Sequence, residues 1–575
     1  MTLSYDRHGF SLDGSPHRIL SGAAHYFRSR PEQWPHLMRS LAAMGLNTVE
    51  TYLAWNHHEP VEGEWRRLDE IPRFLDAAAE AGLRSIVRPG PYICAEWDNG
   101  GLPSWLTARV GRAIRTSSPV FLDPVKRYLD AVVPLFADHP SVLMVQIENE
   151  YGSFGSDADY LADLAAALRE RGVGVPLFTS DGPSDVMLTG GAVPGHLATV
   201  NFGSGAPAAF DTLRGLRPDD APMCMEYWCG WFDHWGHGRV TREAEDAAAS
   251  LREILAQHAS VNLYMAHGGT NFGTGAGANH HPEHGGEGYR PTVTSYDYDA
   301  PLDERGAPTA KFFAFREEFQ RVSDTPLPEL PDMPPLAAPQ TIRMTREAPV
   351  SFRPAGRSPI PLTFEELGID HGLVRYRTTV PGPRAAEQLT LERLRDRAHV
   401  RVDGVLRAIV ERAGDDVEIA VTGPSELEVV VESMGRINYG PLIGETKGVD
   451  AIRHGRQQLH GFEIDVLPIS DDPRPDWAAP APPADAPRYV GGEFDMPEQA
   501  DGHLDLSGWS KGYVWVNGFS LGRYWTAAGP QTSLYVPWPI LRPGRNEIVI
   551  LELDGIPSAD VPFGPHPGLG ARRAS

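Results

Sequence analysis

Eight short apolar runs, each followed by a segment with helical periodicity, occupy the first 325 residues or so of this 575-residue chain. Segment 32–44 places Trp34 and Leu41 on one helical face, and Gly45 follows it as a helix stop. Strands that alternate with helices pair in parallel, so eight such units predict a closed (β/α)8 barrel, the TIM-barrel form of an α/β fold. The predicted strands are 18–24, 47–52, 84–88, 142–147, 176–179, 198–202, 223–226 and 261–265.

An open, doubly wound sheet is the alternative arrangement for such a pattern. That fold usually carries a Gly-rich nucleotide-binding turn after its first strand, and the segment SGAAHYF at this place contains none. The closed barrel is therefore the favoured interpretation.

Two proline-rich stretches, 325–339 and 471–487, divide the rest of the chain and are typical of linkers. The segments that follow them contain Asp403-Gly404 and Asn517-Gly518 between alternating apolar residues, a strong β-hairpin signal. We predict two sandwich-like all-β domains, whose boundaries can shift if strands are exchanged across a linker. The predicted units are a barrel at 1–325, a linker at 326–345, an all-β domain at 346–470, a linker at 471–487 and a jelly-roll domain at 488–575.

Charge and cysteine content narrow the classes of partner and the compartment. Acidic residues outnumber basic ones, 76 to 52, which argues against nucleic acid or an anionic membrane surface and suits a neutral substrate. No apolar run approaches the ~20 residues of a membrane span, and the N-terminus lacks a signal-peptide pattern. The three cysteines, Cys94, Cys224 and Cys229, indicate a reducing compartment, although a Cys224–Cys229 bridge is conceivable. We expect a cytoplasmic protein.

Carboxylates follow two of the predicted barrel strands, at the edge where (β/α)8 barrels carry their active residues. The fourth strand ends in VQIENEYG and the seventh in MCMEYWCGWFDHW. Because a charge deep in a barrel is costly, Glu150 at the exit is a better candidate than Glu148. Glu150 and Glu226 can flank a sugar across the barrel mouth, as the ~5–5.5 Å carboxyl pair of a retaining glycosidase does. One carboxylate would attack the anomeric carbon, and the other would protonate the departing oxygen.

Seven ordered blocks resemble glycoside hydrolase family 35, in its bacterial, intracellular form. They are SGAAHYFRSRPEQW, GLNTVETYLAWNHHEP, RPGPYICAEWDNGGLPSWL, QIENEYG, EYWCGWFDHWG, HGGTNFG and SYDYDAPLDERG. GRINYG at 435–440 is also similar to a block of the family, and GYVWVNGFSLGRYW resembles part of its terminal jelly-roll domain. The resemblance therefore covers nearly the whole chain.

The resemblance implies a role for individual residues. Glu150 stands at the acid/base position and Glu226 at that of the nucleophile, with Asn149 placed to hydrogen-bond the sugar 2-hydroxyl. Glu96 and the Cys94–Ala95 backbone are the candidates for reading the axial 4-hydroxyl that distinguishes galactose, because a mismatched epimer would leave a buried polar group unpaired. The residues expected to surround the galactose are Tyr52, Cys94, Ala95, Glu96 and Tyr298.

Two features near these blocks admit more than one interpretation. Trp228 and Trp231 either form a leaving-group subsite, helped by Tyr439, or only pack the barrel rim. After HGGTNFG the chain is rich in Gly and His, and this segment, 273–290, departs from familiar animal relatives. A mobile polar loop is favoured there over a metal site, because the family needs no metal. The histidines concerned are His280, His281 and His284.

The expected reaction is the removal of terminal, non-reducing β-linked galactose from short oligosaccharides with retention, without a cofactor or metal, by a monomer or homodimer. A β-1,3 preference is implied by the resemblance alone. An exo-β-glucosaminidase would keep both glutamates but alter the sugar-reading residues, and Tyr52, Glu96 and Tyr298 are all present. A non-catalytic galactoside-binding protein would have lost one glutamate. The β domains are expected to brace the barrel.

Overall fold

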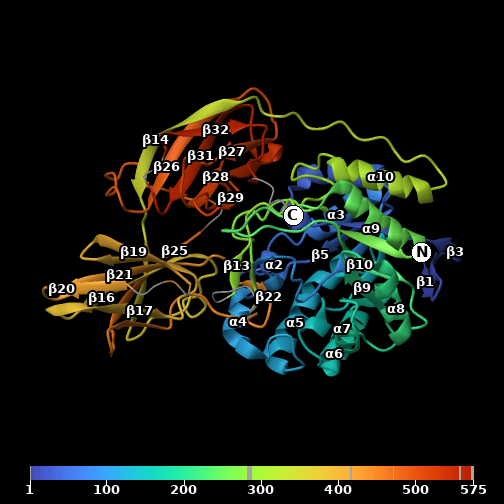
Figure 1. Ribbon diagram of the computed structural model, residues 1–575, viewed down its shortest axis with the longest axis horizontal. Helices are drawn as coiled ribbons and strands as arrows, with labels where there is room; N and C mark the ends of the chain where they lie inside the picture. The colour runs from blue at the N-terminus through green and yellow to red at the C-terminus, as the bar shows by residue number, and fades with distance from the viewer. Residues whose placement is uncertain are drawn as a thin grey trace.

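The computed structural model describes residues 2–281, 288–412, 414, 417–469, 472–555 and 558–570. Figure 1 shows the barrel with its helices on one side of the molecule and two β domains, one above the other, on the opposite side. Within the described residues, the helices are too short or too polar to span a bilayer.

The N-terminal part is a closed barrel of eight parallel strands, which confirms the predicted fold. Every predicted strand is present, and the register closes where the last strand pairs with the first. The barrel strands are β4 (Leu20–Ala24), β5 (Thr48–Tyr52), β6 (Arg84–Arg88), β7 (Val142–Gln146), β8 (Leu177–Asp181), β9 (Leu197–Phe202), β10 (Met223–Trp228) and β11 (Ser260–His267).

Helices cover the outside of the barrel, and their ends follow local sequence signals. In α6, the Asp157 side chain accepts a hydrogen bond from the Tyr160 backbone N–H and caps the first turn. In α1, Gly45 ends the helix with a φ of 111°, which an L side chain rarely adopts. The main covering helices are α1 (Trp34–Met44), α3 (Glu70–Glu80), α5 (Pro119–Val132), α6 (Ala158–Glu170), α8 (Ala206–Leu216), α9 (Ala244–Ala256) and α10 (Ala310–Val322).

A small antiparallel sheet precedes the barrel and closes its N-terminal end. Leu3 and Phe10 of this sheet pack in one apolar cluster with the first residues of the barrel strands, such as Met223. The barrel interior therefore opens toward solvent at its opposite, C-terminal end. The sheet consists of β1 (Leu3–Asp6), β2 (Gly9–Leu12) and β3 (Ser15–His17).

The first all-β domain is a sandwich with a single apolar core between its sheets. The predicted Asp403-Gly404 turn joins β18 to β19, with Val402 paired to Val405. One sheet contains β15 (Arg353–Ser358), β25 (Phe462–Pro468), β16 (Gly372–Val380), β21 (Ser425–Glu432), β18 (Arg397–Val402) and β19 (Val405–Glu411). The other contains β20 (Val417–Val421), β17 (Arg384–Glu392), β23 (Ala451–His454) and β24 (Gln457–Gln458).

The C-terminal domain contains one strand from before the sandwich. β14 (Gln340–Pro349) pairs with β26 (Arg488–Met496) and with β32 (Asp560–Gly564), and Figure 1 shows it in yellow among the orange and red strands. Its Ile342 and Met344 enter the apolar core of this domain. The boundary expected at residues 345/346 thus falls inside β14, because the strands that pair with β14 follow the second linker in the sequence. The remaining strands are β27 (Gly502–Asp505), β28 (Gly512–Val516), β29 (Phe519–Tyr524), β30 (Ser533–Val536) and β31 (Gly544–Glu552).

A three-stranded sheet joins the barrel mouth to the sandwich domain. β22 (Ile437–Tyr439) lies parallel to β12 (Ala278–His280), which pairs with β13 (Tyr289–Pro291). β12 and β13 belong to the loop that follows the last barrel strand. The sandwich domain therefore contributes residues to the wall of the barrel mouth (Figure 1).

Candidate active site

A cavity of about 170 Å³ opens at the C-terminal mouth of the barrel. It brings together all ten residues singled out from the sequence, from barrel segments far apart in the chain. Tyr439, from the sandwich domain, completes one wall. The lining residues are Tyr52, Cys94, Ala95, Glu96, Asn149, Glu150, Glu226, Trp228, Trp231, Phe232, Tyr264, Asn279, Tyr298 and Tyr439.

Glu226, near the end of β10, is buried and held by three donors. Its Oε1 accepts from the Tyr52 hydroxyl at 2.9 Å and from Arg88 Nη2 at 2.6 Å. Its Oε2 accepts from Trp228 Nε1 at 3.2 Å. An ionised carboxylate only accepts hydrogen bonds, so this arrangement fits the charged form and leaves lone pairs on the cavity side.

Glu150, which follows β7, lies in a different environment. Its backbone has a φ of 46°, and its Oε1 accepts from Asn201 Nδ2 at 3.0 Å. Burial and the nearby Glu226 carboxylate raise the pKa of Glu150 to about 8. Glu150 is therefore protonated at neutral pH beside a carboxylate that three donors hold, and such a pair can divide acid and nucleophile roles.

Glu148, two residues earlier, illustrates why the strand exit matters. It is buried, and Arg115 binds both of its oxygens, at 2.9 and 2.7 Å. Tyr160 of α6 donates a further hydrogen bond at 3.0 Å. Glu148 is thus engaged in a buried ion pair and does not line the cavity, as the sequence argument expected.

The segment that carries Glu96 has three consecutive residues in the left-handed region, with φ of 56°, 55° and 49° for Cys94, Ala95 and Glu96. Such a run is strained and persists only when its surroundings fix it. Arg28 donates to the Ala95 carbonyl, and the Gly277 N–H donates to the Glu96 carbonyl at 2.9 Å. The turn presents the Glu96 carboxyl and the adjacent backbone to the cavity.

Glu96 is surrounded by polar partners but is deeply buried. The Tyr296 hydroxyl donates to its Oε2, and Asn438 Nδ2 of the sandwich domain lies 3.5 Å from its Oε1. Burial raises the pKa of Glu96 to about 7, against the opposing effects of Tyr296 and Arg28. Its carboxyl group can therefore donate or accept near neutral pH, which suits recognition of a sugar hydroxyl.

Arg88 is the main residue that sequence reasoning missed. Its Nη2 donates to Glu226 and, at 2.6 Å, to Asn149 Oδ1, while its Nε donates to Gln146. It ends β6, within the quoted block RPGPYICAEW, so a charged residue at a strand exit was the available signal. Tyr264, Asn279 and Phe232 also line the cavity without having been singled out.

The two tryptophans lie at the outer edge of the cavity. Trp228 donates a hydrogen bond to Glu226. Trp231 is 39% exposed and packs edge to face against Trp228, with the two ring centroids 5.8 Å apart. A neighbouring cavity of about 260 Å³ shares Trp231, Phe232, Asn279 and Tyr439 with the first. The two cavities therefore adjoin along a partly aromatic wall.

The Gly- and His-rich segment forms part of that second cavity. His280 and His281 line it, whereas His284 lies outside the described residues. All three cysteines belong to the described residues and are free and buried, so the conceivable Cys224–Cys229 bridge is absent.

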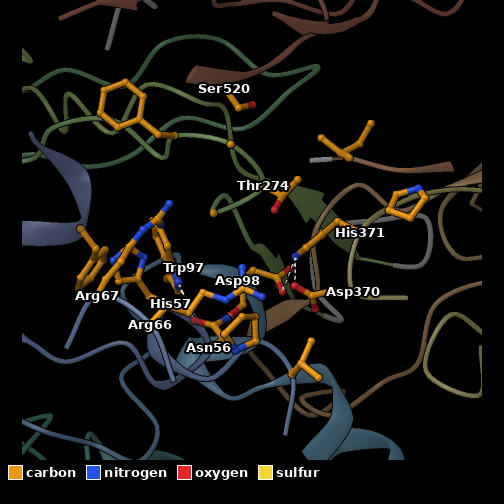
Figure 2. Close-up of a pocket in the computed structure, with 18 of the residues that line it drawn as sticks. Asn56, His57, Arg66, Arg67, Trp97, Asp98, Thr274, Asp370, His371 and Ser520 are labelled. Atoms are coloured by element: carbon orange, nitrogen blue, oxygen red, sulfur yellow. Dashed lines mark hydrogen bonds and ion pairs between the residues drawn. The ribbon is translucent and has the colours of Figure 1, made fainter. Parts of the chain in front are cut away.

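Metal-ligating side chains converge elsewhere, in a larger cavity of about 420 Å³ between the barrel and both β domains (Figure 2). His371 Nε2 lies 3.2 Å from an Asp98 oxygen and 3.4 Å from an Asp370 oxygen. Arg436 Nη1 lies 3.5 and 3.4 Å from the same two carboxylates. A cation already neutralises them, so we interpret this group as an ion-pair network. The network, called the junction cluster below, comprises Asp98, Glu365, Asp370, His371 and Arg436.

A closed barrel that presents two glutamates and several aromatic rings at the exits of its fourth and seventh strands has the site of a glycoside hydrolase. Residues 9–322 match the family model described as glycosyl hydrolases family 35. Residues 361–468 match a β-galactosidase first all-beta domain, and residues 487–546 match a β-galactosidase galactose-binding domain.

Curated relatives give the same result. A β-galactosidase of Xanthomonas manihotis is 41% identical over 482 residues, which cover 80% of this chain and 79% of the relative. A human β-galactosidase is 39% identical over 472 residues, which cover 78% of this chain and 68% of the relative. A bovine β-galactosidase is 38% identical over 605 residues, which cover 97% of this chain and 91% of the relative. The chain belongs to glycosyl hydrolase family 35 and is a glycoside hydrolase.

Proposed function

We propose that the protein removes terminal, non-reducing β-D-galactosyl residues from oligosaccharides with retention of configuration. The observation that carries this proposal is the pair of glutamates in one cavity, with Glu226 held by donors and the pKa of Glu150 raised to about 8. Family membership and the names of the three relatives described above, each a β-galactosidase, support the choice of sugar.

In the first step, a Glu226 oxygen forms a bond to the anomeric carbon as the glycosidic C–O bond breaks. Glu150 gives its proton to the departing oxygen, so the leaving group departs as a neutral alcohol. Formation of the ester removes the negative charge of Glu226, which is one cause of the raised Glu150 pKa. The pKa of Glu150 then falls, and its carboxylate becomes a suitable base.

In the second step, Glu150 takes a proton from water, and the hydroxyl oxygen attacks the anomeric carbon from the side that the leaving group vacated. The bond to Glu226 breaks, and galactose leaves with its original configuration. Asn149 is proposed to hydrogen-bond the 2-hydroxyl. Arg88 and Gln146, at 2.6 and 3.2 Å from Asn149 Oδ1, fix that side chain.

Cavity size and polarity support removal of one terminal galactose at a time. A volume of about 170 Å³ is below the ~300–1,000 Å³ of pockets for larger ligands and fits a single sugar ring. Glu96 and the Cys94–Ala95 backbone are proposed to read the axial 4-hydroxyl, with Tyr52 and Tyr298 beside the ring. Rejection of an epimer then follows from the unpaired polar group that it would leave.

The leaving group is proposed to lie against Trp228, Trp231 and Tyr439, where the second cavity begins. A preference for β-1,3 linkages is proposed on family resemblance alone. The free, buried cysteines support a reducing compartment, and imported short oligosaccharides are the proposed substrates there.

The test is hydrolysis of a panel of p-nitrophenyl glycosides, including β-galactoside, β-glucoside and β-glucosaminide, by the wild type and by Glu226→Gln. We expect selective cleavage of the β-galactoside and its loss, by about 10⁴-fold, in the variant. Cleavage of another sugar with the galactoside untouched would overturn the specificity. Full activity of Glu226→Gln would overturn the assignment of the nucleophile.

A further inference from the structure

A second buried glutamate lies behind the candidate nucleophile. Glu50 is in the middle of β5, two residues before Tyr52, and adjacent inward positions of a strand share one face. Its side chain is completely buried, as is that of Arg88 on the neighbouring strand. A buried carboxylate is costly unless a cation or hydrogen bonds compensate it, so this position requires an explanation.

Arg88 lies between Glu50 and Glu226. Its Nη2 donates to Glu226 at 2.6 Å, and its Nη1 lies 3.8 Å from Glu50 Oε1. Neither Nη1 nor Oε1 has a hydrogen-bond partner among the described residues, so the two atoms face each other unsatisfied. One guanidinium therefore lies between two carboxylates in the interior of the barrel.

The other surroundings of Glu50 are polar or neutral. Asn262 Nδ2 of β11 lies 3.4 Å from Oε2, and β4 pairs alongside β5 through Ser21, Gly22 and Ala23. The titratable and charged groups that act on Glu50 within the described part of the chain are Arg88 of β6, Glu226 of β10 and Tyr52 of its own strand. The charge of Glu50 therefore interacts chiefly with Arg88.

We propose that Glu50 is a positioning residue that acts through Arg88. The negative charge of Glu50 offsets the charge of the Arg88 guanidinium and weakens the interaction of Arg88 with Glu226. The candidate acid Glu150 therefore stays protonated into the alkaline range. This inference rests on the proposed roles of Glu226 and Glu150. Burial raises the pKa of Glu50 to about 7, with Arg88 opposing and Glu226 adding to the shift, so the offset operates above neutral pH. Arg88 lowers the pKa of Glu150, and an ionised Glu50 counters that effect.

The sign of the effect follows from the charge states. Below pH 7, Glu50 is mostly neutral, so Glu50→Gln should leave the acid limb of the kcat/KM profile in place. Above pH 7, the variant lacks the negative charge that offsets Arg88. The alkaline limb should then move to lower pH, because the unopposed Arg88 guanidinium lowers the pKa of Glu150 further.

The experiment measures pH profiles of kcat/KM for p-nitrophenyl β-galactoside with the wild type, Glu50→Gln and Glu304→Gln. Glu304 is a matched control, since burial raises its pKa to about 8 and its carboxylate accepts from Thr270 at 2.6 Å, away from Arg88. Only Glu50→Gln should shift the alkaline limb. A purely structural role would lower activity at all pH values without moving either limb, and that result would overturn the proposal.

Glu50→Met provides a second variant if Glu50→Gln does not fold. It also removes the charge, so the alkaline limb should move in the same direction. Unmoved limbs in folded Glu50→Met would then also overturn the proposal. If the wild type cleaves a different glycoside, the same profiles on that substrate test Glu50, and only the specificity in the proposed function fails.

Discussion

The candidate active site and the junction cluster both gather carboxylates, but cations contact them to different extents. In the junction cluster, Arg436 and His371 contact Asp98, Asp370 and Glu365. Burial alone would raise the pKa of Asp98, but His371 and Arg436 hold it well below its usual range. Each carboxylate of the junction cluster contacts Arg436 or His371, and the cluster is a network of ion pairs.

In the candidate active site, burial outweighs the effect of the nearby cations on the carboxyl groups. Arg88 is the guanidinium that contacts Glu226; Glu96 and Glu150 line the same cavity, and Glu50 lies on the far side of Arg88. Burial, with Glu226 next, raises the pKa of Glu150 to about 8, and burial raises those of Glu96 and Glu50 to about 7. A carboxylate in direct contact with a cation stays ionised and stabilises the fold, whereas buried carboxyl groups with less compensation can exchange protons near neutral pH.

The largest effect that separates the two clusters is expected for Glu150→Gln. Activity on a galactosyl disaccharide should fall about 10²- to 10⁴-fold, because the leaving oxygen loses its proton donor. A substrate with a highly acidic leaving group, such as 2,4-dinitrophenyl β-galactoside, should retain more of its cleavage rate in the first step. Equal losses on both substrates would remove Glu150 from the acid role.

The same variant also tests the charge balance through stability. The pKa of Glu150 is raised from 4.5 to about 8 in the folded state, so the folded protein binds more protons than the unfolded chain between these pH values. Wild-type stability is therefore lost relative to Glu150→Gln as pH rises from about 4.5 to 8. Urea unfolding at several pH values measures this difference, and a constant difference would contradict the raised pKa.

In the junction cluster, Arg436→Ala should lower the stability of the folded protein. It leaves Asp98 and Glu365 buried without their guanidinium, a change that costs about 3–5 kcal/mol for a buried pair. Urea denaturation should show this loss, with Arg109→Ala, an exposed partner of Glu62, as a control that changes little. A small loss for Arg436→Ala would mean that the junction cluster does not stabilise the domain contact.

The smallest effect is expected at the outer edge of the site. Trp231→Ala should reduce disaccharide turnover by about 3- to 10-fold, the order of one aromatic contact, and aryl-galactoside turnover by less. Steady-state kinetics with both substrates provide the measurement. Equal damage to both would indicate that Trp231 only packs the rim.

Much of this architecture could be predicted because its signals are local. The eight barrel strands appear as separate apolar runs, and Glu150 and Glu226 follow two of them. The Asp403-Gly404 turn depends on two adjacent residues and was found for the same reason. Since catalytic residues of a barrel gather at strand exits, the fold prediction also placed the candidate site.

The rest depends on contacts between distant segments. β14 pairs with β26, more than a hundred residues later, so its place in the C-terminal domain cannot be inferred from its own pattern. Arg436 donates its backbone N–H to Asp98 across 338 residues of sequence. Arg88 lies between Glu50 and Glu226 only when β5, β6 and β10 close into one barrel.

The central claim, a covalent intermediate on Glu226, is tested most directly by trapping it. The wild type would be incubated with 2-deoxy-2-fluoro-β-D-galactosyl fluoride, and the protein and its peptides analysed by mass spectrometry. We predict one fluorogalactosyl group per chain, attached to Glu226, with loss of activity in proportion. An adduct on another residue, or release of galactose with inverted configuration and no adduct, would contradict the account.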